Sequence, residues 1–128
     1  MDKNMKILVV DDFSTMRRII KNLLRELDMN NTLEADDGAT GWPIMQQGGI
    51  DFLVTDWNMP KMNGLDLIKR VRADENLKST PILLVTAEAK REQIVEAAQA
   101  GVNGYIVKPF TAVTLKEKID AIFKRIEG

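Results

Sequence analysis

The sequence contains no cysteine and no histidine among its 128 residues. Without these two residue types, a Ser-His-Asp triad, a Cys-His pair, a disulfide and a histidine-based zinc site are all excluded. Any chemistry must therefore use carboxylates, hydroxyls or amines. Any bound metal must suit hard oxygen ligands, as Mg²⁺, Mn²⁺ and Ca²⁺ do. The lack of cysteine also fits a cytoplasmic protein.

Long hydrophobic runs and an excess of positive charge are missing as well. The apolar runs are strand-sized, far below the ~20 residues that a membrane helix needs, and no secretory signal peptide is visible. A formal net charge of −1, with Lys and Arg spread along the chain, gives no basic surface for nucleic acid. With 45% hydrophobic and 29% charged residues, we expect one cytoplasmic globular domain that binds neither membrane nor nucleic acid.

Apolar segments alternate with amphipathic ones along the chain. The predicted strands are 5–10, 32–35, 52–56, 82–86 and 105–108, and the predicted helices are 14–27, a segment through 45–47, 64–71, 87–100 and 112–126. Strands this apolar predict a parallel sheet covered by helices on both faces. Right-handed crossovers restrict the topology to doubly wound orders, and five strands fit the flavodoxin-like order 2-1-3-4-5. The predicted fold class is therefore α/β.

Local signals predict how the helices begin and which side they bury. Ser14 and Thr111 are expected to cap the first and last helices. Helical spacing places Arg17 on the solvent side of the first helix. Gly41-Trp42-Pro43 lies near the start of the second helix, which should start late or bend because proline is tolerated only in a first turn. The buried face of the first helix is predicted to consist of Met16, Ile19, Ile20, Leu23, Leu24 and Leu27.

Polar residues end every strand that borders the middle of the predicted sheet. Asp56 ends the third strand, Asp11 and Asp12 follow the first, and Thr86 and Lys108 end the fourth and fifth. The carboxyl ends of parallel strands share one edge, where ligands bind in such folds. We therefore expect these side chains to converge. Three neighbouring carboxylates repel one another unless a cation compensates, and Mg²⁺ that keeps several waters is the natural partner.

This set of residues suits phosphoryl transfer onto a carboxylate. Asp56 is interpreted as the nucleophile, because an aspartyl phosphate is a recognised covalent intermediate. Lys108 offers a point charge for a phosphoryl oxygen or for Asp56 itself, and Thr86 offers a hydroxyl. Taken singly, each residue has a structural alternative. Asp56 could turn the chain, Asp11 and Asp12 could favour the positive end of the following helix, and Lys108 could be an ion-pair partner.

The same residues resemble the signature of two-component receiver domains over the whole chain, residues 1–128. The signature consists of Asp11-Asp12, Asp56, Thr86, Tyr105 and Lys108-Pro109. The longer stretches 10–18, 55–60, 85–90 and 104–111 are similar to the chemotaxis response regulators within that family. The resemblance implies that a histidine kinase phosphorylates Asp56. It also implies that the Asp12 and Asp56 side chains and the Asn58 backbone carbonyl bind Mg²⁺, while Asp11 acts largely through water.

The resemblance further implies a switch. Lys108 would contact the phosphoryl group, and Thr86 would move towards it. Tyr105 would pass from exposed to buried and remodel the face formed by the fourth helix, the fifth strand and the last helix. In the family this face binds the flagellar motor switch, and the Lys108-Pro109 peptide is usually cis.

Two positions depart from the family pattern. Asp28 stands where the family usually has a glycine after the first helix, so an aspartate must carry a left-handed cap there. Gly41-Trp42-Pro43 replaces the usual helix-forming residues of the second helix. Neither departure touches the predicted phosphorylation site, so we expect their effects to be on local stability.

The leading hypothesis is a stand-alone, monomeric response regulator that is a phosphoacceptor and not an enzyme with its own substrate. The chain stops after the last helix, so no output domain is expected, and a chemotaxis kinase, the motor switch and possibly a phosphatase would be its partners. One alternative is a single-domain receiver of another pathway, acting as a phosphate sink or relay. Another is a Mg²⁺-dependent phosphatase with an aspartyl nucleophile. A third is a flavin mononucleotide carrier, which the acidic rim disfavours.

Overall fold

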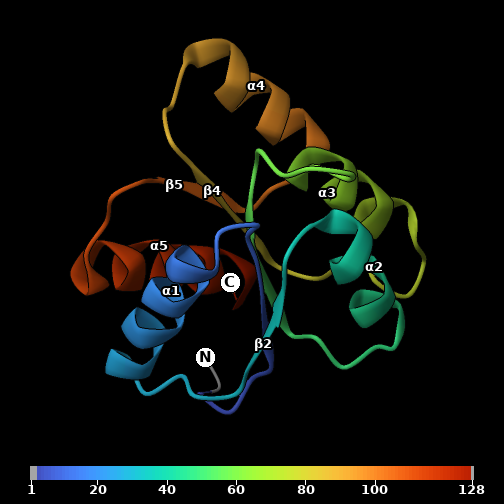
Figure 1. The fold of residues 1–128 in the computed structure, drawn as a ribbon. Coiled ribbons are helices and arrows are strands. Elements are labelled where there is room, and N and C mark those ends of the chain that lie inside the picture. The colour runs from blue at the N-terminus through green and yellow to red at the C-terminus, as the bar shows by residue number, and fades with distance from the viewer. Residues whose placement is uncertain (1–2, 128) are drawn as a thin grey trace.

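The computed structural model describes residues 3–127, and its strands and helices alternate along the chain (Figure 1). In chain order the elements are β1 Ile7–Val10, α1 Ser14–Glu26, β2 Thr32–Ala35, α2 Gly38–Gln46, β3 Phe52–Asp56, α3 Gly64–Ala73, β4 Ile82–Thr86, α4 Arg91–Ala100, β5 Gly104–Val107 and α5 Ala112–Glu127. All five predicted strands are confirmed, with small shifts at their ends.

The strands form one parallel sheet in the order β2-β1-β3-β4-β5. This confirms the predicted α/β fold class and the doubly wound order. The register pairs Val10 with Thr55, Asp56 with Val85, and Thr86 with Val107. The carboxyl ends of β1, β3, β4 and β5 are therefore level, and whatever follows these strands lies along one edge of the sheet.

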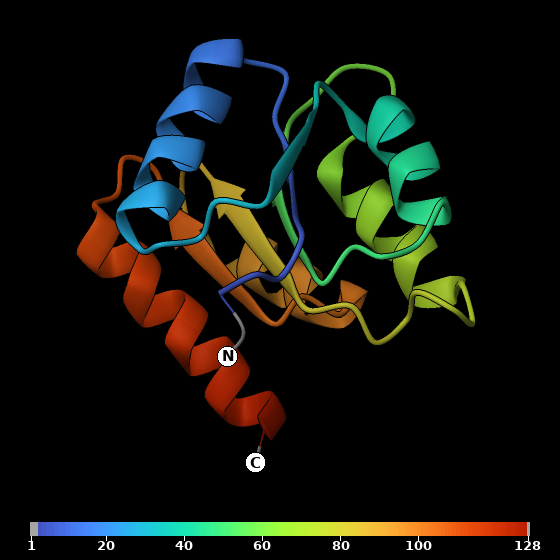
Figure 2. The same cartoon turned by 90° about the horizontal axis from the view of Figure 1, so that it is seen from below.

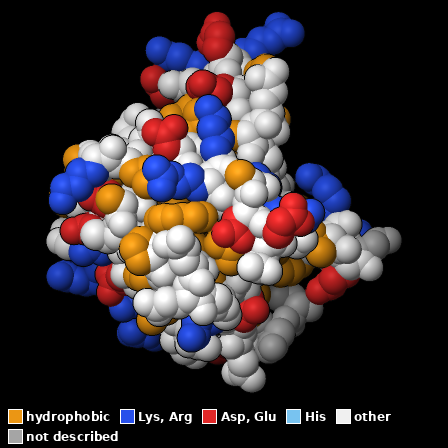
Figure 3. Space-filling model, turned by 90° about the vertical axis from the view of Figure 1, so that its right-hand side faces the viewer, with side chains coloured by type: hydrophobic (Ala, Val, Ile, Leu, Met, Phe, Trp, Pro, Cys, Tyr) orange, Lys and Arg blue, Asp and Glu red, His pale blue; other side chains and the backbone are white. Residues whose placement is uncertain are grey.

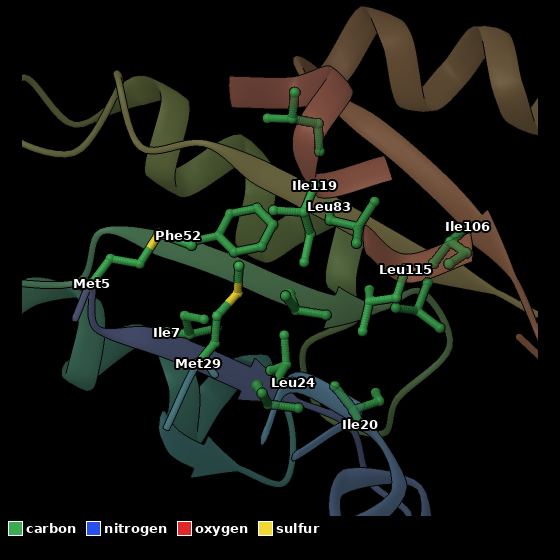
Figure 4. Packing of buried hydrophobic residues seen from close by; sticks show 14 residues of the cluster. Met5, Ile7, Ile20, Leu24, Met29, Phe52, Leu83, Ile106, Leu115 and Ile119 are labelled. Atoms are coloured by element: carbon green, nitrogen blue, oxygen red, sulfur yellow. The ribbon is translucent and has the colours of Figure 1, made fainter. Parts of the chain in front are cut away.

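Helices cover both faces of the sheet, with α1 and α5 on one side and α2 and α3 on the other (Figure 2). Because successive side chains of a strand point to opposite faces, Ile7 and Val9 pack under α1 and α5, whereas Leu8 and Val10 pack under α2 and α3. Figure 4 shows the first of these cores, where Phe52 and Leu83 of the sheet meet residues of α1 and α5. Burying one such side chain contributes roughly 1.5–3 kcal/mol.

The start of α4 was predicted wrongly. The helix begins at Arg91, not at Ala87, and residues 87–90 form an exposed loop. The Thr86 hydroxyl explains the delay, because it donates a hydrogen bond to the Glu88 backbone carbonyl at 2.9 Å. Such a local side-chain bond offers the backbone an alternative to the helix. Only Ala97 and Ala100 of α4 are buried, so this helix packs less deeply than its neighbours.

Of the two outcomes predicted for α2, a late start or a bend, the late start is wrong. The helix begins at Gly38, and Pro43 lies inside it. A capping box explains the early start. The Asp37 carboxylate accepts from the Thr40 N–H at 3.0 Å, and the Thr40 hydroxyl accepts from the Asp37 N–H at 3.1 Å. These bonds satisfy two backbone donors and favour a start ahead of the proline, although Pro43 has no N–H to give to the helix.

The start of α1 departs from its prediction as well. Ser14 is the first helical residue and not its cap, and Phe13 occupies the cap position without a side-chain hydrogen bond. The Phe13 N–H instead donates a hydrogen bond to Asp11 Oδ1 at 2.9 Å. On the predicted buried face, Ile20 and Leu24 are buried, but Ile19 is 43% exposed because it lies at the flank of the apolar stripe.

Two predicted helix caps are confirmed. Asp28 follows α1 with a φ of 63°, so an aspartate does carry the left-handed cap. The Met29 N–H donates to the Leu24 carbonyl at 2.9 Å across this turn, which is the bond pattern of a Schellman motif. At α5, the Thr111 hydroxyl accepts from the Thr114 N–H at 3.2 Å.

The side formed by α2 and α3 carries hydrophobic side chains between charged groups (Figure 3). Trp42 is half-buried against the core here, and the Arg70 guanidinium lies 5.9 Å from the centroid of its ring. Gly41-Trp42-Pro43 therefore contributes to packing between α2 and α3. Within residues 3–127, none of the helices has the length and apolar character that spanning a membrane requires.

Candidate metal and phosphoryl-acceptor site

Asp56 is the last residue of β3, and its side chain is buried at the carboxyl edge of the sheet. The residue is 8% exposed. Gly64 at the start of α3 passes close to its backbone: the Gly64 N–H donates to the Trp57 carbonyl at 2.8 Å, and a Cβ at Gly64 would clash with the Asp56 carbonyl oxygen. Only glycine allows this close approach, so the loop after Asp56 turns back tightly onto the strand end.

Asp11 and Asp12 reach the same point from β1. Asp11 is 1% exposed and Asp12 is exposed. Together with Asp56 they offer three carboxylate oxygens that all lie within 4.8 Å of one another. The structure therefore brings together the three acidic residues that the sequence predicted to converge, although Asp56 is more than 40 residues from the other two along the chain.

Lys108 brings one ammonium group to this cluster. Its Nζ lies 3.2 Å from Asp56 Oδ1 and 3.5 Å from Asp11 Oδ2. One positive charge against three carboxylates leaves the cluster negative at neutral pH. Because Asp56 and Asp11 are buried, this repulsion is weakly screened. Lys108 thus lies against Asp56, one of the two partners that the sequence analysis offered it, and the Lys108-Pro109 peptide is cis, as the resemblance implies.

The Asp56 carboxyl has a raised pKa. Burial is the main cause, the neighbouring Asp11 charge adds to it, and Lys108 acts in the opposite direction. A nearby divalent cation would favour the ionised form. The donor set suits Mg²⁺, because the ligands are carboxylate oxygens at one open edge of the sheet and Asp12 is exposed to water.

The loop from Trp57 to Asn63 is held from two sides. The Gly64 contact fixes its end, and the Gly38 N–H at the start of α2 donates to the Met62 carbonyl at 2.8 Å. A Cβ at Gly38 would lie 2.6 Å from that same carbonyl oxygen. Asn58, predicted to offer its carbonyl to a metal, lies exposed on this loop, two residues after Asp56.

Thr86, next to the strand that ends at Asp56, shares a small hollow with Tyr105. Thr86 ends β4, is buried, and uses its hydroxyl to bind the Glu88 carbonyl. Tyr105 is half-buried on β5 and lines one small hollow with Thr86, Glu88 and Trp57. On its other side Tyr105 borders a groove with Val107, Phe110 and Lys118, and Lys118 Nζ lies 5.3 Å from the centroid of the Tyr105 ring.

Arg17 is a contact that the sequence analysis missed. Helical spacing placed it on the solvent side, but its Nη1 donates to the Asp11 backbone carbonyl at 2.6 Å and its Nε to Glu34 Oε1 at 3.0 Å. The placement was wrong because a long side chain can reach back past the helix end to the preceding loop. A basic residue in the first turn after an acidic loop is the signal that could have found it.

Comparisons with known proteins agree with this geometry. The family model for the response regulator receiver domain matches residues 7–120. The chain is 71% identical over 126 residues to the chemotaxis protein CheY-3 of Vibrio cholerae, covering 98% of this chain and 97% of the relative. It is 71% identical over 124 residues to the chemotaxis protein CheY of Pseudomonas aeruginosa, covering 97% and 100%.

Solved structures match as well. A high-resolution structure of CheY4 of Vibrio cholerae superposes with a TM-score of 0.86 at 32% identity, covering 93% of this chain and 98% of the other. The receiver domain of the sensor histidine kinase PA1611 from Pseudomonas aeruginosa gives a TM-score of 0.85 at 26% identity, covering 94% and 98%. That structure is described as having a magnesium ion coordinated in the active site cleft.

Proposed function

Because the chain belongs to the response regulator receiver family, we propose that it is a chemotaxis response regulator switched by Mg²⁺-dependent phosphorylation of Asp56. The observation that carries the proposal is the cluster of Asp11, Asp12 and Asp56 facing Lys108 at the carboxyl edge of the sheet. The strong identity to chemotaxis proteins over nearly the whole chain supports the chemotaxis assignment.

Each residue of the site has a separate role in the proposed reaction. Asp11, Asp12 and Asp56 would hold Mg²⁺ with the Asn58 carbonyl, and the ion would neutralise negative charge on the phosphoryl oxygens. An Asp56 carboxylate oxygen forms the bond to phosphorus while the bond from phosphorus to the histidine nitrogen of the kinase breaks, and that nitrogen keeps the electron pair. Lys108 lies against Asp56 already and can donate to a phosphoryl oxygen there.

The switch follows from the present partner of Thr86. Its hydroxyl is engaged with the Glu88 carbonyl, and a phosphoryl group on Asp56 offers a stronger, charged acceptor. When Thr86 turns towards that group, the Glu88 carbonyl loses its partner beside Tyr105. Phosphorylation thus favours one of two arrangements of these residues and shifts the population between them.

The output surface is the face of α4, β5 and α5, where Tyr105 borders the groove with Val107, Phe110 and Lys118. We infer that the flagellar motor switch binds here, and that a chemotaxis histidine kinase supplies the phosphoryl group to the monomer. The protein then acts as a switch that takes part in its own phosphorylation and dephosphorylation and does not turn over a separate substrate.

Labelling with acetyl phosphate in the presence of Mg²⁺ tests the acceptor. The parent protein should gain one phosphoryl group, and Asp56→Asn should gain none. Asp66→Asn, which changes an exposed carboxylate on α3, should label like the parent. Labelling of Asp56→Asn at another residue would remove Asp56 from its role.

Binding to a motor-switch protein tests the output. With beryllofluoride, a phosphoryl mimic, the parent should be retained on the immobilised switch protein far more than without it, and Asp56→Asn should show no such difference. Labelling without beryllofluoride-dependent retention would instead favour a receiver that acts as a phosphate sink or relay.

A further inference from the structure

We propose that Arg17 is a positioning residue that holds the loop of Asp11, Asp12 and Phe13 so that the first two face Asp56. The inference rests on the proposed metal and phosphoryl site and assigns Arg17 a part in it. Arg17 touches neither Asp56 nor the Asp12 carboxylate in the described contacts. It acts through the backbone of Asp11.

Arg17 joins three elements around the acidic cluster. From α1, its Nη1 donates to the Asp11 carbonyl at 2.6 Å, and its Nε donates to Glu34 Oε1 on β2 at 3.0 Å. Its backbone N–H donates to the Phe13 carbonyl at 3.1 Å. The bond to Phe13 is the ordinary helical bond of the backbone, so it is the side chain of Arg17 that ties the start of the loop after β1 to α1 and β2.

Both backbone polar groups of Asp11 are hydrogen-bonded. Its N–H donates to the Ala35 carbonyl at 3.1 Å, and its carbonyl accepts from Arg17. Its side chain accepts from the Phe13 N–H at 2.9 Å and also faces Lys108. Because Asp11 is 1% exposed, water cannot readily replace the guanidinium on its carbonyl, and loss of that bond would leave a buried acceptor unpaired.

The first turn of α1 makes this restraint necessary. The Phe13 N–H is held within the loop by Asp11 Oδ1, but the cap position, Phe13, offers no side-chain hydrogen bond to the helix, so no cap side chain ties the loop to α1. The restraint comes instead from inside the helix, four residues after the cap. Asp12, the exposed carboxylate of the cluster, directly follows Asp11, whose carbonyl the Arg17 side chain binds.

Glu34 orients the guanidinium. One of its oxygens binds Arg17, and the other accepts from Lys21 Nζ at 3.0 Å, so the carboxylate is fixed on both sides. Arg17 needs two donors in a rigid fork to bridge Asp11 and Glu34. A lysine presents its three donors from a single nitrogen on a flexible stem, so it does not reproduce the two separate nitrogens, Nη1 and Nε, from which Arg17 reaches Asp11 and Glu34.

An electrostatic role and a positioning role of Arg17 predict opposite changes in Mg²⁺ affinity when its side chain is replaced. A positive group near a Mg²⁺ site repels the ion, so a purely electrostatic role predicts tighter Mg²⁺ binding when the charge is removed. A positioning role predicts weaker binding, because the carboxylates are no longer held together. The sign of the change in the Mg²⁺ dissociation constant therefore separates the two.

The experiment uses the full chain with Trp42→Phe, which leaves Trp57 as the reporter next to Asp56. Mg²⁺ titrations followed by Trp57 fluorescence give the dissociation constant. We expect Arg17→Met to weaken Mg²⁺ binding about tenfold and Arg17→Lys about threefold, and to slow labelling by acetyl phosphate. Arg18→Met, which removes the same charge one residue later at an exposed position, should bind Mg²⁺ as tightly as the parent or slightly more tightly.

The outcomes are decisive in either direction. Urea unfolding measures stability in parallel, and Arg17→Lys serves if Arg17→Met does not fold. Unchanged or tighter Mg²⁺ binding in a folded Arg17 variant would overturn the inference. Arg17 would then contribute only to folding stability or to the charge near the site. If the parent itself binds no Mg²⁺ and takes no label, the proposed function fails instead. If the parent does both and the Arg17 variants match it, only this inference fails.

Discussion

Each end of the sheet holds a half-buried cation, and the two cations face different partners. At the carboxyl end Lys108 lies against Asp56 and Asp11. At the amino end Arg72 of α3 lies only against neutral oxygens. Its Nε donates to the Gly101 carbonyl and its Nη2 to Asn103 Oδ1, both at 2.9 Å, and its Nη1 reaches two carbonyls of the loop between α3 and β4.

The difference separates stability from function within one sheet. The Arg72 guanidinium donates to four neutral oxygens. Asn103 Oδ1 also accepts from the Ile82 N–H at 2.7 Å, so the loops before β4 and β5 are tied together. Around Lys108 one ammonium group faces three carboxylates, and the charge is not balanced. We infer that the amino end stabilises the fold and that the carboxyl end is kept negative so that it can take up a cation.

The largest expected effect is at the amino end. Arg72→Met removes four hydrogen bonds from a charged donor and leaves their acceptors without it. We expect it to lower the free energy of unfolding by about 3 kcal/mol in urea. Arg70→Met, two residues earlier on the same helix, removes only the contact with Trp42 and should cost less than about 1 kcal/mol.

The comparison requires that Arg72→Met leaves the other end unchanged. Its Mg²⁺ dissociation constant, measured by Trp57 fluorescence with Trp42→Phe, should equal that of the parent. A loss of Mg²⁺ affinity in a folded Arg72→Met protein would show that the two ends are coupled, and the proposed division would be wrong.

Mg²⁺ should have the next largest effect, and only through the carboxyl end. At a hundred times its dissociation constant, an ion that binds only the folded state adds about 2.7 kcal/mol to the free energy of unfolding. Urea unfolding and thermal melts with MgCl₂, against NaCl of equal ionic strength, should show this gain in the parent and in Arg72→Met. Asp12→Asn should show much less of it. An unchanged melting temperature of the parent at saturating Mg²⁺ would contradict the cluster.

A smaller effect concerns pH without Mg²⁺. Burial, and then Asp11, raise the pKa of Asp56 above its usual value, so the folded chain binds this proton more tightly than the unfolded chain. The stability from this group is therefore fully present below the usual Asp pKa and is lost as pH rises through the raised pKa. Each unit of difference in pKa corresponds to about 1.4 kcal/mol.

The Asp56→Asn protein isolates that group. The Lys21 hydrogen bond lowers the pKa of Glu34, so the stability that Glu34 contributes is lost as pH falls. Glu34 is present in both proteins, so its contribution cancels from the difference between their free energies of unfolding. The free energy of unfolding in urea should be higher for Asp56→Asn than for the parent at pH 7, and this difference should shrink as pH falls from 7 towards 4. A constant advantage across this range would contradict the raised pKa.

Much of this arrangement could be predicted from the sequence because it follows from strand ends. Apolar runs identified the strands, and a parallel order then required Asp11, Asp56, Thr86 and Lys108 to share one edge. No side-chain conformation was needed for that inference. The left-handed cap at Asp28 followed from a position that the family resemblance singled out.

Contacts that depend on the reach of long or paired side chains could not be predicted. Helical periodicity gives the direction of a Cβ, but Arg17 and Arg72 use the far ends of their side chains to bind carbonyls on other elements. The late start of α4 has a different origin, a local hydrogen bond from the Thr86 hydroxyl to the Glu88 carbonyl that helical periodicity does not reveal.

The smallest expected effect is again at the amino end, in the turn after α1. Asp28 has a φ of 63°, which glycine adopts without the steric cost that a Cβ imposes. Asp28→Gly should therefore stabilise the protein, but only by roughly 0.5 kcal/mol, because the greater freedom of glycine in the unfolded chain offsets part of the gain. The exposed pair of Lys3 with Asp28, at 3.7 Å, contributes little to this balance. Asp28→Ala keeps a Cβ and loses the polar group that tolerates this conformation, so it should destabilise in the same urea assay. Both variants should bind Mg²⁺ like the parent, and a changed Mg²⁺ affinity in either would place α1, and not only its first turn, in the function of the carboxyl end.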